Sequence, residues 1–323
     1  MRSLRGSEST SVVARPSWSA ELELAGAGGE PVDLRRTINS HGLVDLPPMR
    51  PDPDGRALEI TLPLAGGRPR TVRIAEGRPG RALVTAAGRP PSARQAEGLL
   101  AAVAHVLRLD EDLSDFYAQA AGDPDLIWAA AGAGRLIRSP TVFEEVVKTI
   151  CTTNCAWSGT VRMVGALVEH LGEAAPGASP DGPLGRTFPT PAAMAEVGES
   201  FYRDVARAGY RGAYLRSLAD DVAAGHLDLE ELARADADEL PDEEVADRLL
   251  ALPGVGPYAA AHVMMLLGRY SRLVLDSWTR PKYASLRGRA AKDATIERRF
   301  RRFGPYAGLA FWLVLTRDWV PET

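Results

Sequence analysis

The segment Leu252-Pro253-Gly254-Val255-Gly256 limits the fold of this chain more than any other feature of its sequence. It separates two segments with helical apolar spacing, residues 242–250 and 257–268. The two glycines allow the backbone to turn with positive φ and to approach another molecule closely, and Pro257 suits the first turn of a helix. The pattern therefore predicts a helix, a tight turn and a second helix. An ordinary αα-hairpin that binds nothing would show the same pattern.

The predicted turn offers two kinds of backbone ligand. N–H groups at the start of the second helix carry partial positive charge and suit a phosphate group without reading base sequence, which makes Gly254, Val255 and Gly256 candidate DNA-binding residues. Carbonyl oxygens of Leu250, Leu252 and Val255 are candidates to hold a monovalent cation, Na⁺ or K⁺.

An aspartate follows the hairpin at a characteristic distance. The second helix is expected to reach Gly268, a short apolar stretch covers residues 272–275, and Asp276 comes next, 18 residues beyond Tyr258. This combination resembles the helix-hairpin-helix/Gly-Pro-Asp DNA glycosylase superfamily, in which the same hairpin precedes a catalytic aspartate. A helix N-cap before Trp278 is the structural alternative for Asp276, and the two roles are compatible.

The resemblance implies a specific role for Asp276. Cleavage of the bond between a base and deoxyribose builds positive charge on the sugar. A fixed carboxylate stabilises that charge and can orient or deprotonate the attacking water. A position at a helix N-terminus would keep the acid ionised.

Two further segments resemble 8-oxoguanine DNA glycosylase. Residues 150–154 end in Asn154, which falls on that family's DNA-wedging asparagine, and Tyr210-Arg211 matches a pair that handles the base left behind after flipping. Enzymes that act on a base rotate it out of the stack, so the gap must be filled and the orphaned partner bound. The alternatives are a helix cap near Trp157 for Asn154, and a half-buried ring and a surface charge for Tyr210 and Arg211.

The hairpin's second helix departs from the bifunctional members of the superfamily, which carry a lysine there that attacks the sugar as a Schiff base. This chain has Tyr258 at that position, so the resemblance implies base release without lysine-dependent strand cleavage. His262 lies one turn later on the same face and is, with Tyr258, a candidate for the base pocket. A buried core histidine is the alternative for His262. His41-Gly42 is a weaker candidate to approach this pocket.

The rest of the chain predicts an α+β fold. Alternating segments at 18–24 and 57–64, with short apolar runs at 71–74 and 82–85, indicate a small antiparallel sheet. From Pro91-Ser92 onward the spacing is helical, with helices expected at 92–109, from Ser139-Pro140, and at 157–171, 191–197, 200–208, 211–224, 229–235 and 242–250. We therefore expect a disordered tail (1–17), an N-terminal β domain (18–90) and an all-α glycosylase domain (91–323). The sheet is similar in position to the one shared by 8-oxoguanine DNA glycosylase and 3-methyladenine DNA glycosylase II.

Composition and charge narrow the class of protein further. The net charge is −4, but residues 280–302 are dense in arginine and could face phosphates or simply form a solvated helix face. Cys151 and Cys155 are expected to be small buried helix residues, and two thiols cannot hold a four-cysteine iron–sulfur cluster. No apolar run approaches the roughly 20 residues of a membrane helix. We expect a cytoplasmic protein, monomeric and without a membrane partner.

These patterns favour one function over its competitors. The leading hypothesis is a monofunctional DNA glycosylase that releases a damaged purine from double-stranded DNA in base-excision repair. The alternative is a non-catalytic helix-hairpin-helix DNA-binding protein, against which the presence of Asp276 argues. A transferase or metalloenzyme lacks support, because the sequence has neither a glycine-rich phosphate loop nor a clustered His/Cys/Asp ligand set.

Overall fold

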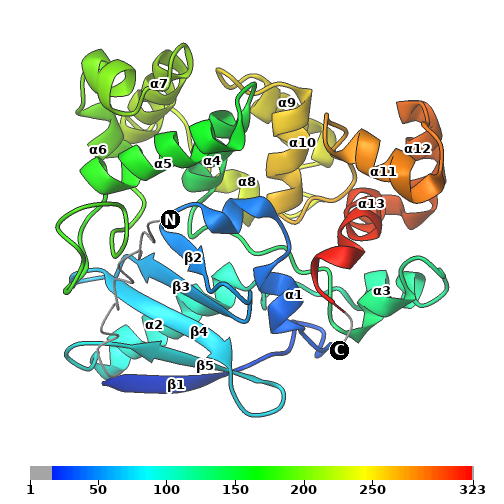
Figure 1. Ribbon diagram of the computed structural model, residues 1–323, viewed down its shortest axis with the longest axis horizontal. Coiled ribbons are helices and arrows are strands. Elements are labelled where there is room, and N and C mark those ends of the chain that lie inside the picture. The colour runs from blue at the N-terminus through cyan, green and yellow to red at the C-terminus, as the bar shows by residue number, and fades with distance from the viewer. Residues whose placement is uncertain (1–16, 322–323) are drawn as a thin grey trace, which may run out of the picture.

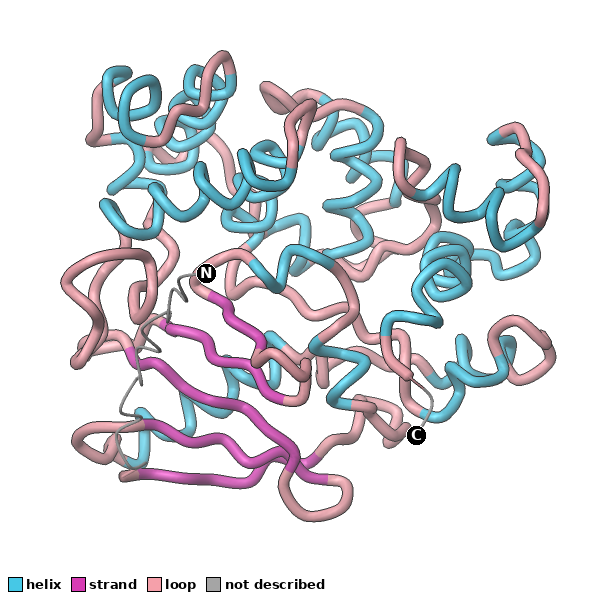
Figure 2. The backbone as a smooth tube through the Cα atoms, viewed as in Figure 1, coloured by secondary structure: helices cyan, strands magenta, loops and turns pink. Residues whose placement is uncertain are grey.

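The computed structural model describes residues 17–321, so the expected tail lies, except for Ser17, outside the described residues. Within this range the molecule has a β-sheet layer at one side and a larger set of helices beside it (Figure 1). Figure 2 shows the strands together at the lower left, with helix behind them and most of the other helices above and to the right. The predicted α+β fold class, with the sheet first and the helices after it, is confirmed.

The sheet is antiparallel, with strand order β1-β5-β4-β3-β2. Its strands are β1 (Trp18–Glu23), β2 (Met49–Pro51), β3 (Ala57–Leu62), β4 (Arg70–Glu76) and β5 (Arg81–Ala86). In β5, Ala82, Val84 and Ala86 are buried while the residues between them are not, which is the alternation expected of a strand with one face on a core. The short strand β2 was not predicted, because its three residues are too few to show a period.

Helix α2 (Ala93–Val106) covers the buried face of the sheet. Ser92 begins it with a capping box: the Ser92 hydroxyl accepts from the Gln95 N–H, and the Gln95 side chain accepts from the Ser92 N–H. Leu99 and Val103 pack against strand residues in one core. Helix α2 therefore shares a core with the sheet, although it begins after residue 90.

The helices other than α2 form the rest of the molecule. They are α1 (Leu34–Ile38), α3 (Ser114–Ala120), α4 (Val142–Thr152), α5 (Trp157–Leu171), α6 (Pro191–Ala195), α7 (Arg211–Ala223), α8 (Glu231–Arg234), α9 (Asp242–Leu250), α10 (Pro257–Leu266), α11 (Thr279–Arg287), α12 (Asp293–Phe300) and α13 (Ala307–Thr316). Short 3₁₀ helices are η1 (Gly42–Asp45), η2 (Ile127–Ala131), η4 (Arg301–Tyr306) and η5 (Arg317–Trp319), and η3 (Phe201–Val205) is a short π-helix. The predicted bounds of α5 and α9 are confirmed.

Two local expectations in this region are wrong. Pro140 does not lie in the first turn of α4, because Thr141 follows it as the N-cap and accepts a hydrogen bond from the Glu144 N–H. Cys155 is not a buried helix residue: α4 ends at Thr152, and Cys155 is exposed in the loop that follows, while Cys151 is buried as expected. The sequence spacing suggested one helix face for both cysteines, but the chain leaves the helix between them.

The N-terminal segment reaches into the helical layer. Leu43 and Leu46 are buried in the same core as α4, α5 and α10, and the indole N–H of Trp312 on α13 donates to the Ser40 carbonyl, 2.8 Å away. These contacts hold the loop that contains His41 against the helices. Within residues 17–321, no helix is long and apolar enough to cross a membrane.

Candidate active site

The hairpin turn needs glycine at Gly254. Its φ is 82°, in the left-handed region that favours glycine, and a Cβ built there would lie 2.6 Å from Cδ2 of Tyr214. Tyr214 on α7 therefore packs directly beneath the turn. The Val255 N–H donates to the Leu252 carbonyl across 3.1 Å and closes the turn.

Gly256 has a different role from the one expected of it. Its φ of −98° and ψ of −177° are extended, so the prediction of positive φ at both glycines is wrong for this one. It is the N-cap of α10, with Pro257 at the first helical position and open space where a side chain would stand. The backbone N–H groups at this helix start are free of intrahelical partners, as at any helix N-terminus.

Asp276 lies at the start of α11, and the helix fixes one of its oxygens. Oδ1 accepts from the backbone N–H groups of Trp278 (2.8 Å) and Thr279 (2.6 Å), while the Asp276 N–H donates to the Thr279 hydroxyl. In the described part of the chain, Oδ2 forms no hydrogen bond with another residue. The cap expected as an alternative role is thus present, and it leaves one carboxylate oxygen available.

The hairpin, Asp276 and several other predicted residues line one cavity of about 570 Å³. Its lining residues are Thr152, Thr153, Asn154, Cys155, Tyr210, Tyr214, Gly254, Gly256, Pro257, Tyr258, Ala259, Asp276 and Ser277. Segments from α4, α7, α10 and α11 therefore meet here, although the sequence separates them widely. We call this cavity the hairpin pocket.

Asn154 and Tyr210 meet at the rim of the hairpin pocket. Both are exposed, and the Asn154 side-chain amide donates to the Tyr210 hydroxyl at 3.4 Å. Asn154 has a φ of 47°, a left-handed conformation that asparagine tolerates better than most residues. The turn after α4 thus presents the Asn154 side chain at the surface.

Arg211 lies behind these two residues and does not line the pocket. It is buried, its guanidinium donates to the Thr153 carbonyl through Nε (3.0 Å) and Nη2, and its Cζ lies 4.6 Å from the centre of the Tyr210 ring. The alternative of a surface charge is therefore wrong. Arg211 ties the turn after α4 to the start of α7, and it supports Tyr210 from below.

His262 is buried behind Tyr258, where their ring centres are 5.8 Å apart. It also faces His41, at 6.4 Å, and Trp312, at 6.5 Å. Neither His262 ring nitrogen has a hydrogen-bond partner within residues 17–321. His41 Nε2 lies 2.5 Å from the Ile137 carbonyl, and because a carbonyl only accepts, Nε2 carries the proton and Nδ1 is an acceptor without a partner.

Burial controls the protonation of both imidazoles. It lowers the pKa of His262 to about 4, against a smaller opposing effect of the Asp276 charge, and it lowers the pKa of His41 to about 3. Burial likewise raises the pKa of the Tyr258 phenol, although a hydrogen bond with Thr152 opposes this. Near neutral pH these three side chains are therefore uncharged, and Asp276 is the acid of the hairpin pocket.

The lowered pKa of His262 predicts an acid-dependent loss of stability. The unfolded chain takes up a proton on this residue near pH 6.5 and the folded chain only near pH 4, so stability present above pH 6.5 is lost as the pH falls between these values. From about pH 7 to pH 5, wild type should lose on the order of 2 kcal/mol relative to His262→Phe. Urea denaturation of both proteins at each pH measures the difference, and parallel pH profiles would contradict it.

The lysines of the chain lie away from the hairpin pocket. Lys148 is buried and paired with Glu144 at 2.6 Å, and Lys282 pairs with Asp318 at 2.5 Å. Lys292 lines a separate cavity beside α12. None of them is among the residues that line the hairpin pocket.

Comparisons with known proteins bear on this geometry. No family model and no curated protein matches the chain. Among solved structures, a 3-methyladenine DNA glycosylase from Archaeoglobus fulgidus is similar over 94% of this chain and 100% of its own, at 21% identity and a TM-score of 0.69. The chain has the fold of this DNA glycosylase.

Two other structures share this glycosylase fold. The 8-oxoguanine glycosylase/lyase of Clostridium acetobutylicum, in its apo-form, covers 92% of this chain and 95% of its own, at 19% identity and a TM-score of 0.67. A structure described as MBOgg1 in complex with a low-affinity DNA ligand covers 93% of this chain and 96% of its own, at 18% identity and a TM-score of 0.68. The predicted relation to both glycosylase types is therefore confirmed at the level of the fold.

Several residues that shape the pocket were not predicted. The Thr152 side chain forms a hydrogen bond with the Tyr258 phenol. Cys155 and Ser277 also line the cavity. Ser277 directly follows Asp276, so its position next to the pocket was predictable from the neighbouring residue. No local pattern indicated that Thr152 lies there, because its contact with Tyr258 depends on how α4 packs against α10.

Proposed function

We propose that this protein is a monofunctional DNA glycosylase that flips out and hydrolytically releases a damaged purine. The observation that carries the proposal is the position of Asp276. It lines the same cavity as the hairpin turn, with one oxygen fixed by the first turn of α11 and the other available. A carboxylate held in this way suits stabilisation of positive charge on a deoxyribose ring.

The hairpin would hold the DNA backbone next to this acid. Backbone N–H groups at the start of α10 present a phosphate site that is independent of base sequence. A phosphate bound at Gly254, Val255 and Gly256 would place the adjoining sugar toward Asp276, because Gly254, Gly256 and Asp276 border one cavity. Water activated by the carboxylate then attacks the sugar as the base leaves.

Asn154 and Tyr210 are suited to occupy the space that a flipped base leaves. Both project from the pocket rim and touch one another, and an amide and a phenol ring can bond and stack on the orphaned base. Arg211 would not touch the DNA itself. It would position Tyr210, whose ring it contacts, and the turn after α4, whose Thr153 carbonyl accepts its hydrogen bond. Tyr258, with His262 and His41 behind it, would form the wall of the base pocket.

The purine substrate is proposed from two kinds of support. The structural neighbours are described as acting on 3-methyladenine and on 8-oxoguanine, and one is bound to double-stranded DNA with cytosine opposite 8-oxoguanine. The Tyr258 phenol, which is uncharged near neutral pH, is a polar group in the cavity lining that can form a hydrogen bond with a base edge. His262 and His41 lie behind it and do not line the cavity. A bulky two-ring base suits a cavity of this size.

A monovalent cation fits the hairpin turn. In the described residues, no backbone N–H outside the helices donates to the carbonyl oxygens of Leu250 or Val255, and the Leu252 carbonyl accepts only the Val255 N–H. Carbonyl oxygens with spare lone pairs suit Na⁺ or K⁺. A cation there would add positive charge beside the proposed phosphate site.

A release assay on a panel of duplexes, each with one modified base, tests the proposed function. The expected result is release of at least one damaged purine, detected as a free base and an alkali-sensitive site. Binding to every duplex without release from any would instead support the non-catalytic DNA-binding alternative.

The hairpin phosphate site gives a second test. Gly256→Asp should weaken binding to every DNA sequence alike, by about tenfold, because it places a negative charge at the helix start. The substitution introduces no strain, since φ is −98° and a side chain meets open space. Gly256→Asn is the matched control, with the same size and capping ability but no charge. Fluorescence anisotropy measures the affinity, and overlapping curves for the Asp and Asn variants would show that the hairpin does not hold phosphate.

A further inference from the structure

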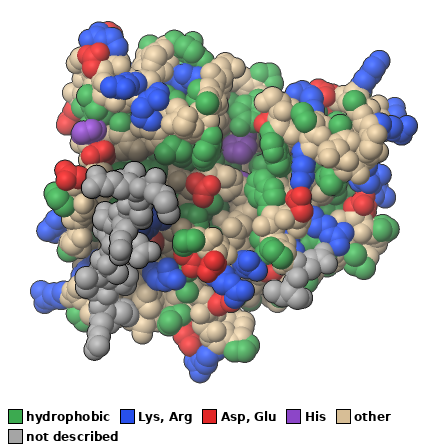
Figure 3. Space-filling model, viewed as in Figure 1, with side chains coloured by type: hydrophobic (Ala, Val, Ile, Leu, Met, Phe, Trp, Pro, Cys, Tyr) green, Lys and Arg blue, Asp and Glu red, His purple; other side chains and the backbone are tan. Residues whose placement is uncertain are grey.

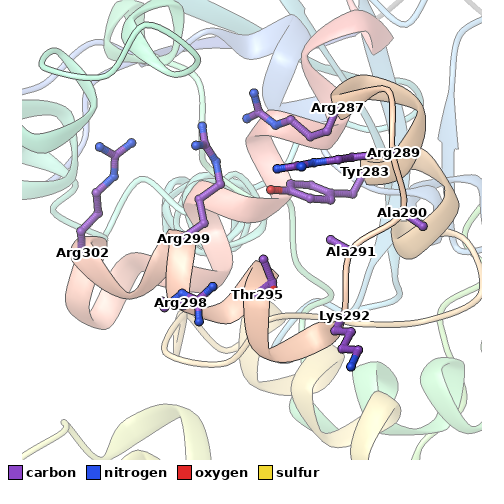
Figure 4. Close-up of a pocket in the computed structure, with 10 residues that line it drawn as sticks. All are labelled: Tyr283, Arg287, Arg289, Ala290, Ala291, Lys292, Thr295, Arg298, Arg299 and Arg302. Carbon is purple, nitrogen blue, oxygen red and sulfur yellow. The ribbon is translucent and has the colours of Figure 1, made fainter.

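Cationic side chains are concentrated beside α12, around a cavity of about 770 Å³ that we call the arginine pocket. Figure 4 shows its lining: Tyr283, Arg287, Arg289, Ala290, Ala291, Lys292, Thr295, Arg298, Arg299 and Arg302. Lys292 points away from the arginines in this view. In Figure 3, blue side chains gather along the same edge of the molecule, over α11 and α12.

The charges of the arginine pocket are only partly balanced. Arg287 and Arg299 share one carboxylate, Asp125, at 2.6 and 2.5 Å, and Arg302 pairs with Asp123. Arg289 and Arg298 form no ion pair within residues 17–321, and both are exposed. The pocket therefore has six cationic side chains against two carboxylates behind it, which is an arrangement suited to an anion.

Three of these arginines are held in place before any ligand arrives. The carboxylates of Asp123 and Asp125 fix them, and the guanidinium of Arg302 also lies 5.0 Å from the centre of the Phe303 ring. Arginine binds phosphate through a planar fork, and a fork that is already oriented loses less freedom on binding. A phosphate group is therefore one anion that these arginines can bind.

Helix α12 lies between the arginine pocket and a cavity that adjoins the hairpin pocket. Thr295, Arg298 and Arg299 line the arginine pocket from one face of the helix, and Arg302, in η4, continues this lining. Asp293 and Glu297, on the opposite face, line the adjoining cavity, which shares Pro257 and Tyr258 with the hairpin pocket. A DNA strand that leaves the hairpin pocket and passes over α12 would reach the arginine pocket.

We propose that the arginine pocket is a second DNA-phosphate site, which binds the backbone outside the lesion and is separate from the site of base release. The proposal rests on the proposed function, because DNA at the hairpin is what brings phosphates to α12. It also requires DNA long enough to extend past α12, since the arginine pocket and the cavity that adjoins the hairpin pocket lie on opposite faces of that helix.

The double variant Arg289→Ala/Arg298→Ala tests this proposal. Its affinity for undamaged DNA is compared with that of wild type on a short duplex and a long one, about 10 and 30 base pairs, or roughly one and three helical turns. On the long duplex the variant should bind about tenfold more weakly, and the slope of log affinity against log salt should fall by about 2, or about 1 for each lost phosphate contact. On the short duplex the two proteins should be equal.

Arg56→Ala/Arg94→Ala is the matched control, because it removes the same charge from exposed positions on the sheet layer. It should change the affinity for neither duplex. Equal binding of wild type and the Arg289/Arg298 variant to the long duplex would overturn the proposal, as would an equal loss on both duplexes. These outcomes use undamaged DNA, so they stay distinct from a failure of the proposed glycosylase activity, which the release assay detects.

Discussion

Asp276→Asn should lower the rate of base release by about 100- to 1,000-fold, the usual effect of removing one positioned electrostatic group. The structure makes this substitution selective. An asparagine oxygen can still accept from the N–H groups of Trp278 and Thr279, so the start of α11 is preserved while the charge is lost. Single-turnover release from a lesion duplex measures the rate, and anisotropy on the same duplex should show that binding survives.

Asp238→Asn is the control for this experiment. It removes the same charge from an exposed position in the acidic segment before α9, and it should leave base release unchanged. If Asp276→Asn were as active as wild type, Asp276 would not be the catalytic acid. A role as helix cap alone predicts this same retention of activity, because the asparagine oxygen keeps the cap. Loss of binding together with release would show that the substitution disturbs DNA binding or the fold rather than the release step alone.

Wild-type protein should form no covalent adduct with DNA when borohydride is added. A lyase that acts through β-elimination needs an amine that reaches the sugar C1′ and forms an imine. By the resemblance of the hairpin to the glycosylase superfamily, Tyr258 is expected at the position where bifunctional members carry the lysine, and a phenol cannot form an imine. Lys148 and Lys282 are held in ion pairs elsewhere, and no lysine lines the hairpin pocket.

The product should accordingly be an intact strand with an abasic site, cut only after alkali or a nuclease is added. Tyr258→Lys should gain a trace of trapping if the new amine meets the sugar, whereas Tyr258→Phe, which also loses the contact with Thr152, should gain none. Efficient trapping by wild type would contradict this expectation. It would direct attention to the N-terminal amine, which lies outside the described residues.

Local patterns predicted much of the fold. Ser92 begins α2 as expected, because a capping box depends on residues only three positions apart. The existence of β5, expected from a short apolar run, and the bounds of α9 were likewise predictable from neighbouring residues. Helix α1 was missed because its five residues show too little periodicity for recognition.

The candidate site was predictable only in part. The hairpin and Asp276 were found because their signals are local: two glycines and a proline define the turn, and Asp276 stands where the next helix begins. The burial of Arg211 was not predicted, because it depends on the Thr153 carbonyl, which another segment supplies. The same holds for Cys155, whose exposure follows from the end of α4 at Thr152.

The sequence by itself determined the two helices and the turn of the hairpin, the aspartate after it, and the order of sheet and helices. Turns, caps and periodicity depend on residues that are close along the chain. Only the tertiary structure decided that His41 meets His262, that Asn154 meets Tyr210, and that Asp125 balances Arg287 and Arg299. Each of these pairs joins segments far apart in the sequence. Their distances are set by how whole helices pack around shared apolar cores, which no local pattern records.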